Sequence, residues 1–137
     1  MAVRFDFTVR SGNTLSLSVP VWDGEGGPIL HATLAASWSA RAAVRPVDES
    51  DVVLQAWSTQ AGTITWGLTS AIPPVGPAAE QLQYVTTGAA LLAITGDMSA
   101  AWDWKVGEYG LDVIDPTGEP TEILLGVIRV EPDAARP

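Results

Sequence analysis

Residues 3–21 read VRFDFTVRSGNTLSLSVPV, and this segment decides the fold class because hydrophobic residues recur at every second position. The alternating apolar residues are Val3, Phe5, Phe7 and Val9 and, after the turn-forming trio at 11–13, Leu15, Leu17 and Val19. Successive side chains of a strand point to opposite faces, so this period predicts two half-buried strands of an antiparallel sheet. Pro20 has no backbone N–H, so we expect the second strand to lie at a sheet edge.

The same alternation predicts further strands along the chain. Residues 34–44 alternate small or apolar residues with Ser and Arg, which predicts a strand, although the alanine content leaves a helix open. Three hairpins are expected, formed by residues 52–57 with 63–69, 81–86 with 89–95, and 109–113 with 122–130. The last segment is apolar on both faces and is therefore expected to be central or covered.

Two connecting segments have a distinct composition. Residues 70–80 read SAIPPVGPAAE, and Pro73, Pro74 and Pro77 exclude a central strand or a long helix there. We expect an ordered, Pro-rich surface excursion. Asp97 is expected to cap a short helical turn over residues 98–102, because its side chain can accept hydrogen bonds from exposed amides.

These patterns predict an all-β protein. The expected architecture is an antiparallel β-sandwich, immunoglobulin-like or jelly-roll-like, with seven to nine strands and at most one short helical turn. A chain of 137 residues normally forms one domain, so we expect a single sandwich over residues 1–131. Residues 132–137 are expected to form a polar C-terminal tail.

The composition excludes several classes of site. The chain has no Cys and one His, which rules out a disulfide framework, a thiolate metal site, a cysteine nucleophile and a multi-histidine metal site. Sixteen acidic residues against seven basic ones give a net charge of −9. Nucleic acid is therefore not an expected partner, because phosphate binding needs clustered Lys and Arg.

No targeting or membrane segment is expected. Asp6 interrupts the N-terminal apolar stretch, which is unlike the apolar core of a signal peptide. The longest apolar run, residues 89–94, is far shorter than the ~20 residues that span a bilayer. We therefore expect a soluble chain that is made in a cytoplasm and has no membrane partner.

Metal and catalytic chemistry have only weak candidates in the sequence. Three acidic turns could supply oxygen ligands for calcium, but none has the EF-hand spacing. The first contains Asp23 and Glu25, the second Asp48, Glu49 and Asp51, and the third Asp115 and Glu119. A carboxylate pair for glycoside hydrolysis would have to come from Asp103, Glu108 and Asp112. His31 could belong to a hydrolase triad, but the chain has no Gly-x-Ser-x-Gly motif to supply the nucleophilic serine. We expect no enzyme, with no catalytic residue, no cofactor and no metal.

The six tryptophans are the most informative side chains. Trp38 and Trp66 lie on the apolar faces of their predicted strands and are expected in the core. The other four fall out of register with the core or near a turn, and exposed Trp often marks a contact surface. The candidate protein interface therefore contains Trp22, Trp57, Trp102, Trp104, Pro73 and Pro74.

The order of motifs resembles the small β-sandwich virion proteins of tailed bacteriophages and prophages, which are similar in plan to the amino-terminal domain of phage baseplate upper proteins. The motifs are RSGNTLSL at 10–17, WDGEGGP at 22–28, ARAAVR at 40–45, the segments 53–65 and 92–102, GEYGLDVIDPTGE at 107–119, and LLGVIRV at 124–130. The chain departs from the pattern at residues 67–84, where the Pro-rich excursion looks inserted.

The resemblance implies a non-enzymatic structural component of the virion. Such an accessory subunit would dock on neighbouring tail, baseplate or head proteins, and its partners would be other virion proteins and copies of itself. An exposed sheet edge could also take part, by adding a strand from a neighbour. The alternative hypothesis is a carbohydrate-binding β-sandwich that reads host-surface glycans through exposed Trp.

Overall fold

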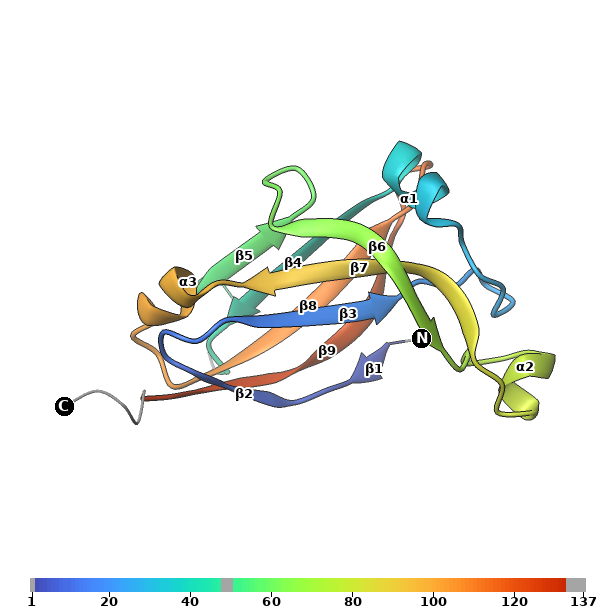
Figure 1. Ribbon diagram of the computed structural model, residues 1–137. Coiled ribbons are helices and arrows are strands. Elements are labelled where there is room, and N and C mark those ends of the chain that lie inside the picture. The colour runs from blue at the N-terminus through green and yellow to red at the C-terminus, as the bar shows by residue number, and fades with distance from the viewer. Residues whose placement is uncertain (1, 48–50, 133–137) are drawn as a thin grey trace.

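Two β-sheets make up most of the protein (Figure 1). The computed structural model describes residues 2–47 and 51–132, and in these ranges it contains nine strands and three short helices. The strands are β1 (Val3–Arg4), β2 (Phe7–Arg10), β3 (Leu15–Pro20), β4 (Ser39–Arg45), β5 (Gln55–Ser58), β6 (Ile64–Ala71), β7 (Val85–Ile94), β8 (Val106–Ile114) and β9 (Pro120–Glu131). The helices are α1 (His31–Ser37), α2 (Pro77–Glu80) and α3 (Gly96–Ala100).

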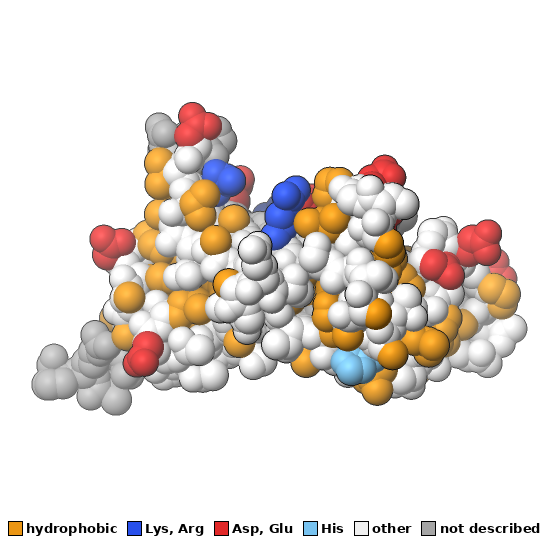
Figure 2. Space-filling model, turned by 90° about the horizontal axis from the view of Figure 1, so that it is seen from above, with side chains coloured by type: hydrophobic (Ala, Val, Ile, Leu, Met, Phe, Trp, Pro, Cys, Tyr) orange, Lys and Arg blue, Asp and Glu red, His pale blue; other side chains and the backbone are white. Residues whose placement is uncertain are grey.

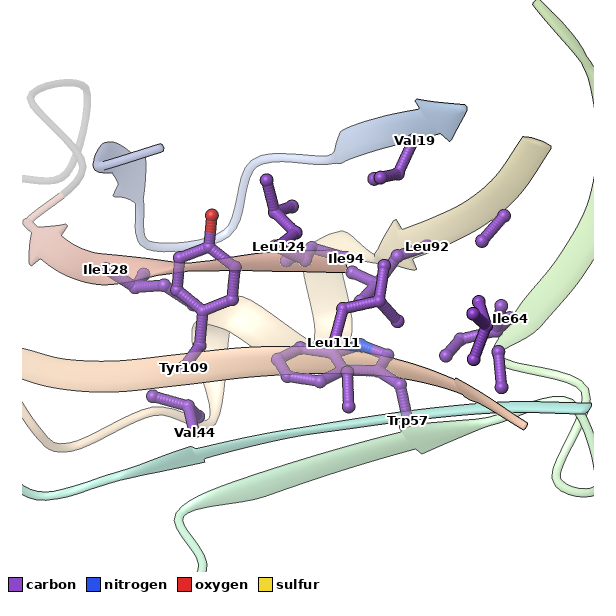
Figure 3. Close-up of a cluster of buried hydrophobic side chains, with 14 of the residues drawn as sticks. Val19, Val44, Trp57, Ile64, Leu92, Ile94, Tyr109, Leu111, Leu124 and Ile128 are labelled. Carbon is purple, nitrogen blue, oxygen red and sulfur yellow. The ribbon is translucent and has the colours of Figure 1, made fainter. Parts of the chain in front are cut away.

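One hydrophobic core joins the two sheets. The larger sheet has the order β1-β9-β8-β4-β5, with β2 also paired to β9, and the smaller has the order β3-β7-β6. Figure 3 shows side chains from both sheets packed together, and those labelled are Val19, Val44, Trp57, Ile64, Leu92, Ile94, Tyr109, Leu111, Leu124 and Ile128. Alternate residues of β4 and β8 are buried, as the period of two in the sequence predicts.

Several predictions about individual elements are confirmed. The chain is mostly β and its nine strands fall in the expected range. Pro20 ends β3, which is an edge strand, and β8 and β9 form the closing hairpin. Strand β9 is paired on both sides, in agreement with its apolar sequence.

Two parts of the predicted fold class are wrong. There are three short helices rather than at most one helical turn. The larger sheet is not wholly antiparallel, because β1 and β2 both pair with β9 in the parallel direction. This arises because the first and last strands of the chain are neighbours, which alternation along one strand does not reveal.

Two predicted hairpins are wrong. Residues 55–58 and 64–71 belong to different sheets: Thr59 N donates to Ala40 O of the larger sheet, whereas Thr63 O accepts from Ala93 N of the smaller one. The turn between them therefore carries the chain from one sheet to the other. Residues 85–94 form one continuous strand, β7, instead of a turn near residue 88.

The predicted strand over residues 34–44 is half correct. Residues 31–37 form α1, in keeping with the high helix propensity of alanine, and β4 begins at Ser39. The buried side chain of Leu34 packs closely against Gly88 of β7 and so fixes the position of the helix. A Cβ added to Gly88 would lie 2.4 Å from Leu34 Cδ1. Thr95, not Asp97, caps α3: its hydroxyl accepts from Met98 N at 3.1 Å.

The first strand is interrupted between β1 and β2. Asp6 Oδ1 accepts from Val127 N at 2.9 Å, and the Phe5 carbonyl accepts from the Tyr109 hydroxyl at 2.5 Å. A Cβ at Gly126 would lie 2.1 Å from that carbonyl oxygen, so the close approach requires glycine. The interruption thus ties the N-terminal strand to the core side of β8.

The hairpin of β6 and β7 extends beyond the rest of its sheet. Strand β3 pairs only with residues 89–94 of β7, Gly88 is hydrogen-bonded to Val21 and Ile29, and the ladder of residues 85–87 involves β6 alone. Helix α2 lies at the tip of this projection, to one side of both sheets (Figure 1). We call residues 72–84, which join the two strands, the arm.

Two further predictions concern the ends of the chain and membranes. Across residues 2–47 and 51–132, no helix is long and apolar enough to cross a bilayer. Most of the predicted polar tail, residues 133–137, lies outside the described residues.

Candidate interaction surfaces

The tryptophans do not form the exposed set that the sequence predicts. Trp57 is 2% exposed and Trp102 is 9% exposed, so the prediction that they lie on the surface is wrong. Trp57 is opposite Ala42 on the core side of β4, and its Nε1 donates to Ala93 O of the other sheet at 3.0 Å. The sequence suggested the opposite register because the strand was assumed to begin at residue 52 rather than 55.

Trp102 and Trp104 pack against each other. Their ring centroids are 4.7 Å apart, with an angle of 34° between the rings. Trp102 Nε1 donates to Gln55 Oε1 at 2.9 Å, whereas Trp104 Nε1 is the one buried side-chain polar atom among the described residues without a hydrogen-bond partner. Because Trp102 is buried and Trp104 is half-buried, the two rings do not form the exposed pair on which the glycan hypothesis depends.

The remaining tryptophans are half-buried. Trp38 and Trp66 pack against the core, as predicted, but keep part of their surface exposed. Trp22 is half-buried and forms an isolated bridge with Pro28 across the acidic turn. Of the four predicted interface tryptophans, Trp22 and Trp104 are half-buried, whereas Trp57 and Trp102 are buried.

The arm presents the two large hydrophobic side chains with the highest exposed fractions among the described residues. Leu82 is 73% and Tyr84 is 72% exposed, and Ile72 and Val75 are also exposed. Of the two predicted prolines, Pro74 is exposed and Pro73 is buried, so the arm agrees with the predicted surface excursion only in part. Between residues 63 and 88, Glu80 is the single charged residue in a chain of net charge −9.

The acidic turn braces the arm from one side. Gly26 has a φ of 82°, and a Cβ there would lie 2.2 Å from the Val75 carbonyl oxygen. Leu82 has a φ of 54°, the left-handed region that leucine rarely adopts. The acidic turn therefore contacts the start of the arm, at Val75 and Gly76.

Sequence reasoning missed Leu82 and Tyr84. The sequence predicts residues 81–86 as one strand of a hairpin, in which both alternate with polar residues, whereas β7 begins only at Val85. Apolar and polar residues can alternate in a loop as they do in a half-buried strand. No signal in the sequence alone distinguishes the two cases.

A second surface is an open trough on the outer face of the larger sheet. Its floor is a row of small residues, Ala56, Ala43 and Gly110, that are neighbours across β5, β4 and β8. Arg41 faces Asp112 across the strands, with Nε 3.5 Å from Oδ2, and Arg45 faces Glu108. Figure 2 shows basic side chains beside a notch between two projecting parts of the surface.

The predicted acidic candidates do not assemble into a catalytic group. Glu108 and Asp112 line the trough together with Glu122, but Asp103 is not part of its lining. Each of the first two carboxylates faces an arginine on β4. His31 is exposed, and its Nε2 lies 3.1 Å from the backbone carbonyl oxygen of Trp66.

The acidic turns use their carboxylates to hold the backbone. Asp23 Oδ1 accepts from the N–H groups of Glu25 and Gly27, and Asp115 Oδ1 accepts from those of Thr117 and Glu119. The Thr117 hydroxyl and the Glu119 N–H lower the pKa of Asp115. The described residues contain no group of three or more potential metal ligands, and Asp48 and Glu49 lie outside them.

Comparison with known proteins found no matching family model and no similar curated protein. The resemblance to virion proteins therefore stays a prediction from the sequence motifs.

Proposed function

We propose that the chain is a non-enzymatic structural subunit of a tailed-phage virion that docks on neighbouring tail, baseplate or head proteins. The order of sequence motifs supports the class of partner. The observation that carries the docking role is the arm, where exposed apolar side chains are displayed on a projection at one end of the smaller sheet (Figure 1). We also propose that the two sheets form a β-sandwich of the immunoglobulin-like or jelly-roll-like kind.

The chemistry of the arm favours contact with another protein. Contiguous exposed apolar surface on a folded protein commonly marks an interaction site. Tyr84 combines a large apolar ring with a hydroxyl that can hydrogen-bond at the rim of an interface, which is typical of an anchor residue. Because the arm has a single charge, docking there removes few charged groups from water.

The test is binding of the purified chain to virions of the phage or prophage that encodes it. The particles should be assembled without the chain and mixed with the wild-type protein or with the double variant L82S/Y84S, and binding should be measured by cosedimentation. We expect the wild type to cosediment and the arm variant to bind at least ~10-fold more weakly, since two exposed anchors are lost.

The control is V52S, which removes an apolar side chain that is also exposed but lies in the connection between β4 and β5, outside the lining of the trough. It should bind like the wild type. Failure of the wild-type chain to cosediment would refute the virion role. Equal binding of L82S/Y84S and the wild type would refute the role of the arm.

A further inference from the structure

Strand β6 exposes one edge of the smaller sheet, and the hydrogen-bonding pattern identifies which backbone groups point outward. Thr63 O accepts from Ala93 N, and Gly88 O of β7 accepts from Val21 N on the opposite side. Backbone groups alternate in direction along a strand, so the odd-numbered residues of β6 pair with β7. The N–H and C=O groups of Ile64, Trp66, Leu68 and Ser70 therefore point away from the sheet.

These outward groups are almost all unpaired. Among the described residues, the one partner is the His31 side chain, whose Nε2 lies 3.1 Å from Trp66 O. Backbone groups at a sheet edge are a template for a further strand.

The other sheet edges carry features that discourage such pairing. Strand β3 ends in Pro20, β5 has only four residues, and the edge formed by β1 and β2 carries Arg4 and Arg10. Strand β6 has eight residues with no proline and no charge. Proteins protect sheet edges with proline, charged side chains or short strands, and β6 is the edge strand that has none of these.

The sequence of β6 is complementary to itself. Residues 65–69 read Thr-Trp-Gly-Leu-Thr, which is symmetric in chemical type about Gly67. In an antiparallel pair with a twofold axis at Gly67, Trp66 faces the partner's Leu68 and Thr65 faces the partner's Thr69. The Thr–Thr pair is of a type that stabilises neighbouring strands, and the Trp–Leu pair brings two apolar side chains together. This register also places the outward groups of Trp66 and Leu68 opposite each other, as hydrogen bonding requires.

The distribution of charge also favours contact between two copies along the edge of β6. Each copy has a net charge of −9, and the segment 63–88 contains only Glu80. Two copies that meet along β6 therefore bring together the least charged part of the chain.

We propose that β6 is a strand-addition edge whose occupant is β6 of a second copy, giving a symmetric dimer with the continuous sheet β3-β7-β6-β6-β7-β3. Such an interface is isologous, because the same strand serves both partners. His31 competes with the partner strand for Trp66 O and must move when the dimer forms. This proposal goes beyond the virion role and does not depend on it.

The test is the oligomeric state of the full chain, measured by sedimentation over a range of concentrations. We expect a monomer–dimer equilibrium for the wild type and a dimer dissociation constant raised at least ~10-fold by L68K, which places a charge on the shared edge. S70K provides a second variant at the same edge, because both side chains are exposed and tolerate lysine. H31A removes the competing side chain and should lower the dissociation constant.

The matched control is L82K, which adds the same charge to an exposed leucine of the arm and should leave the dimer intact. Hydrogen exchange gives an independent signature: the amides of Trp66, Leu68 and Ser70 should become protected only at concentrations where the dimer forms. A wild type and H31A that both stay monomeric would overturn the proposal. So would a dimer in which L68K and S70K behave like L82K, or one that leaves these three amides unprotected.

Discussion

Trp57, Trp102 and Trp104 differ in whether the buried indole N–H has a hydrogen-bond partner. Trp57 donates to the opposite sheet and Trp102 donates to Gln55, so each ring is fixed by one polar contact within an apolar environment. Trp104 packs on Trp102 with its own N–H unpaired. An unpaired buried donor costs free energy that a paired one does not.

This difference predicts that the indole N–H of Trp102 stabilises the protein and that the indole N–H of Trp104 does not. W102F removes the donor and leaves Gln55 Oε1 without its partner, whereas W104F removes an unpaired donor. We expect W102F to lower the free energy of unfolding by at least ~1 kcal/mol more than W104F does. Urea unfolding followed by far-UV circular dichroism measures both, and equal losses would contradict the assignment.

The phenol of Tyr109 has a pH-dependent role. Burial and the nearby Asp6 carboxylate raise the pKa of Tyr109 to about 12, although the positive charge of Arg4 acts to lower it. The folded state thus favours the neutral hydroxyl, which donates to the Phe5 carbonyl. The contribution of this group to stability is complete below pH ~10, the pKa of an unfolded tyrosine, and is lost as the pH rises towards 12.

We therefore expect the wild type to lose stability between pH 10 and 12 more steeply than Y109F, which has no proton to lose at this site. Below pH 9, Y109F should be less stable than the wild type by ~1 kcal/mol, because the hydrogen bond is missing. Denaturant midpoints of both proteins across this pH range provide the measurement. Parallel pH profiles would contradict the role assigned to the hydroxyl.

At the scale of secondary structure, sequence patterns identify strands better than they identify strand partners. The alternation in β2, β3 and β8 reflects burial of one face, which is a local property, and these strands form where predicted. Which strand pairs with which depends on contacts between distant segments. For this reason the turn after β5 was interpreted as a hairpin although it crosses between sheets, and the parallel pairing with β9 was not foreseen.

The candidate surface was predictable to a smaller extent. The prolines indicated an excursion at residues 70–80, and the arm lies there. Trp57 and Trp102 of the predicted interface are buried, and for Trp57 the physical reason is register: a shift of one residue exchanges the inner and outer faces of a strand.

The pairing of the interrupted first strand with β9 predicts a specific intolerance to substitution. G126A places a methyl group where the Phe5 carbonyl lies and should destabilise the protein by ~1–3 kcal/mol, as overpacking does. The control is G24A, since a Cβ at Gly24 meets no atom within 4 Å. Thermal unfolding compares them, and equal melting temperatures for the two variants would contradict the tight approach at Gly126.

At the scale of the whole molecule, both sheets depend on one core. Trp57 of the larger sheet bonds to β7 of the smaller one, and the buried side chains of both belong to a single cluster. Neither sheet buries its apolar face without the other, so we expect one cooperative unfolding transition. Tryptophan fluorescence and far-UV circular dichroism should give the same denaturant midpoint; two separated transitions would show that the sheets unfold independently.

The parallel pairing of the first strand with β9 has a consequence for synthesis on the ribosome. Asp6 and Val127, which are hydrogen-bonded in the folded protein, are 121 residues apart in the chain. At the usual 5–20 residues per second, ~6–24 s pass between the translation of the two residues. During that interval the nascent N-terminal segment has no native partner strand. Translation thus sets the earliest time at which this side of the larger sheet can close.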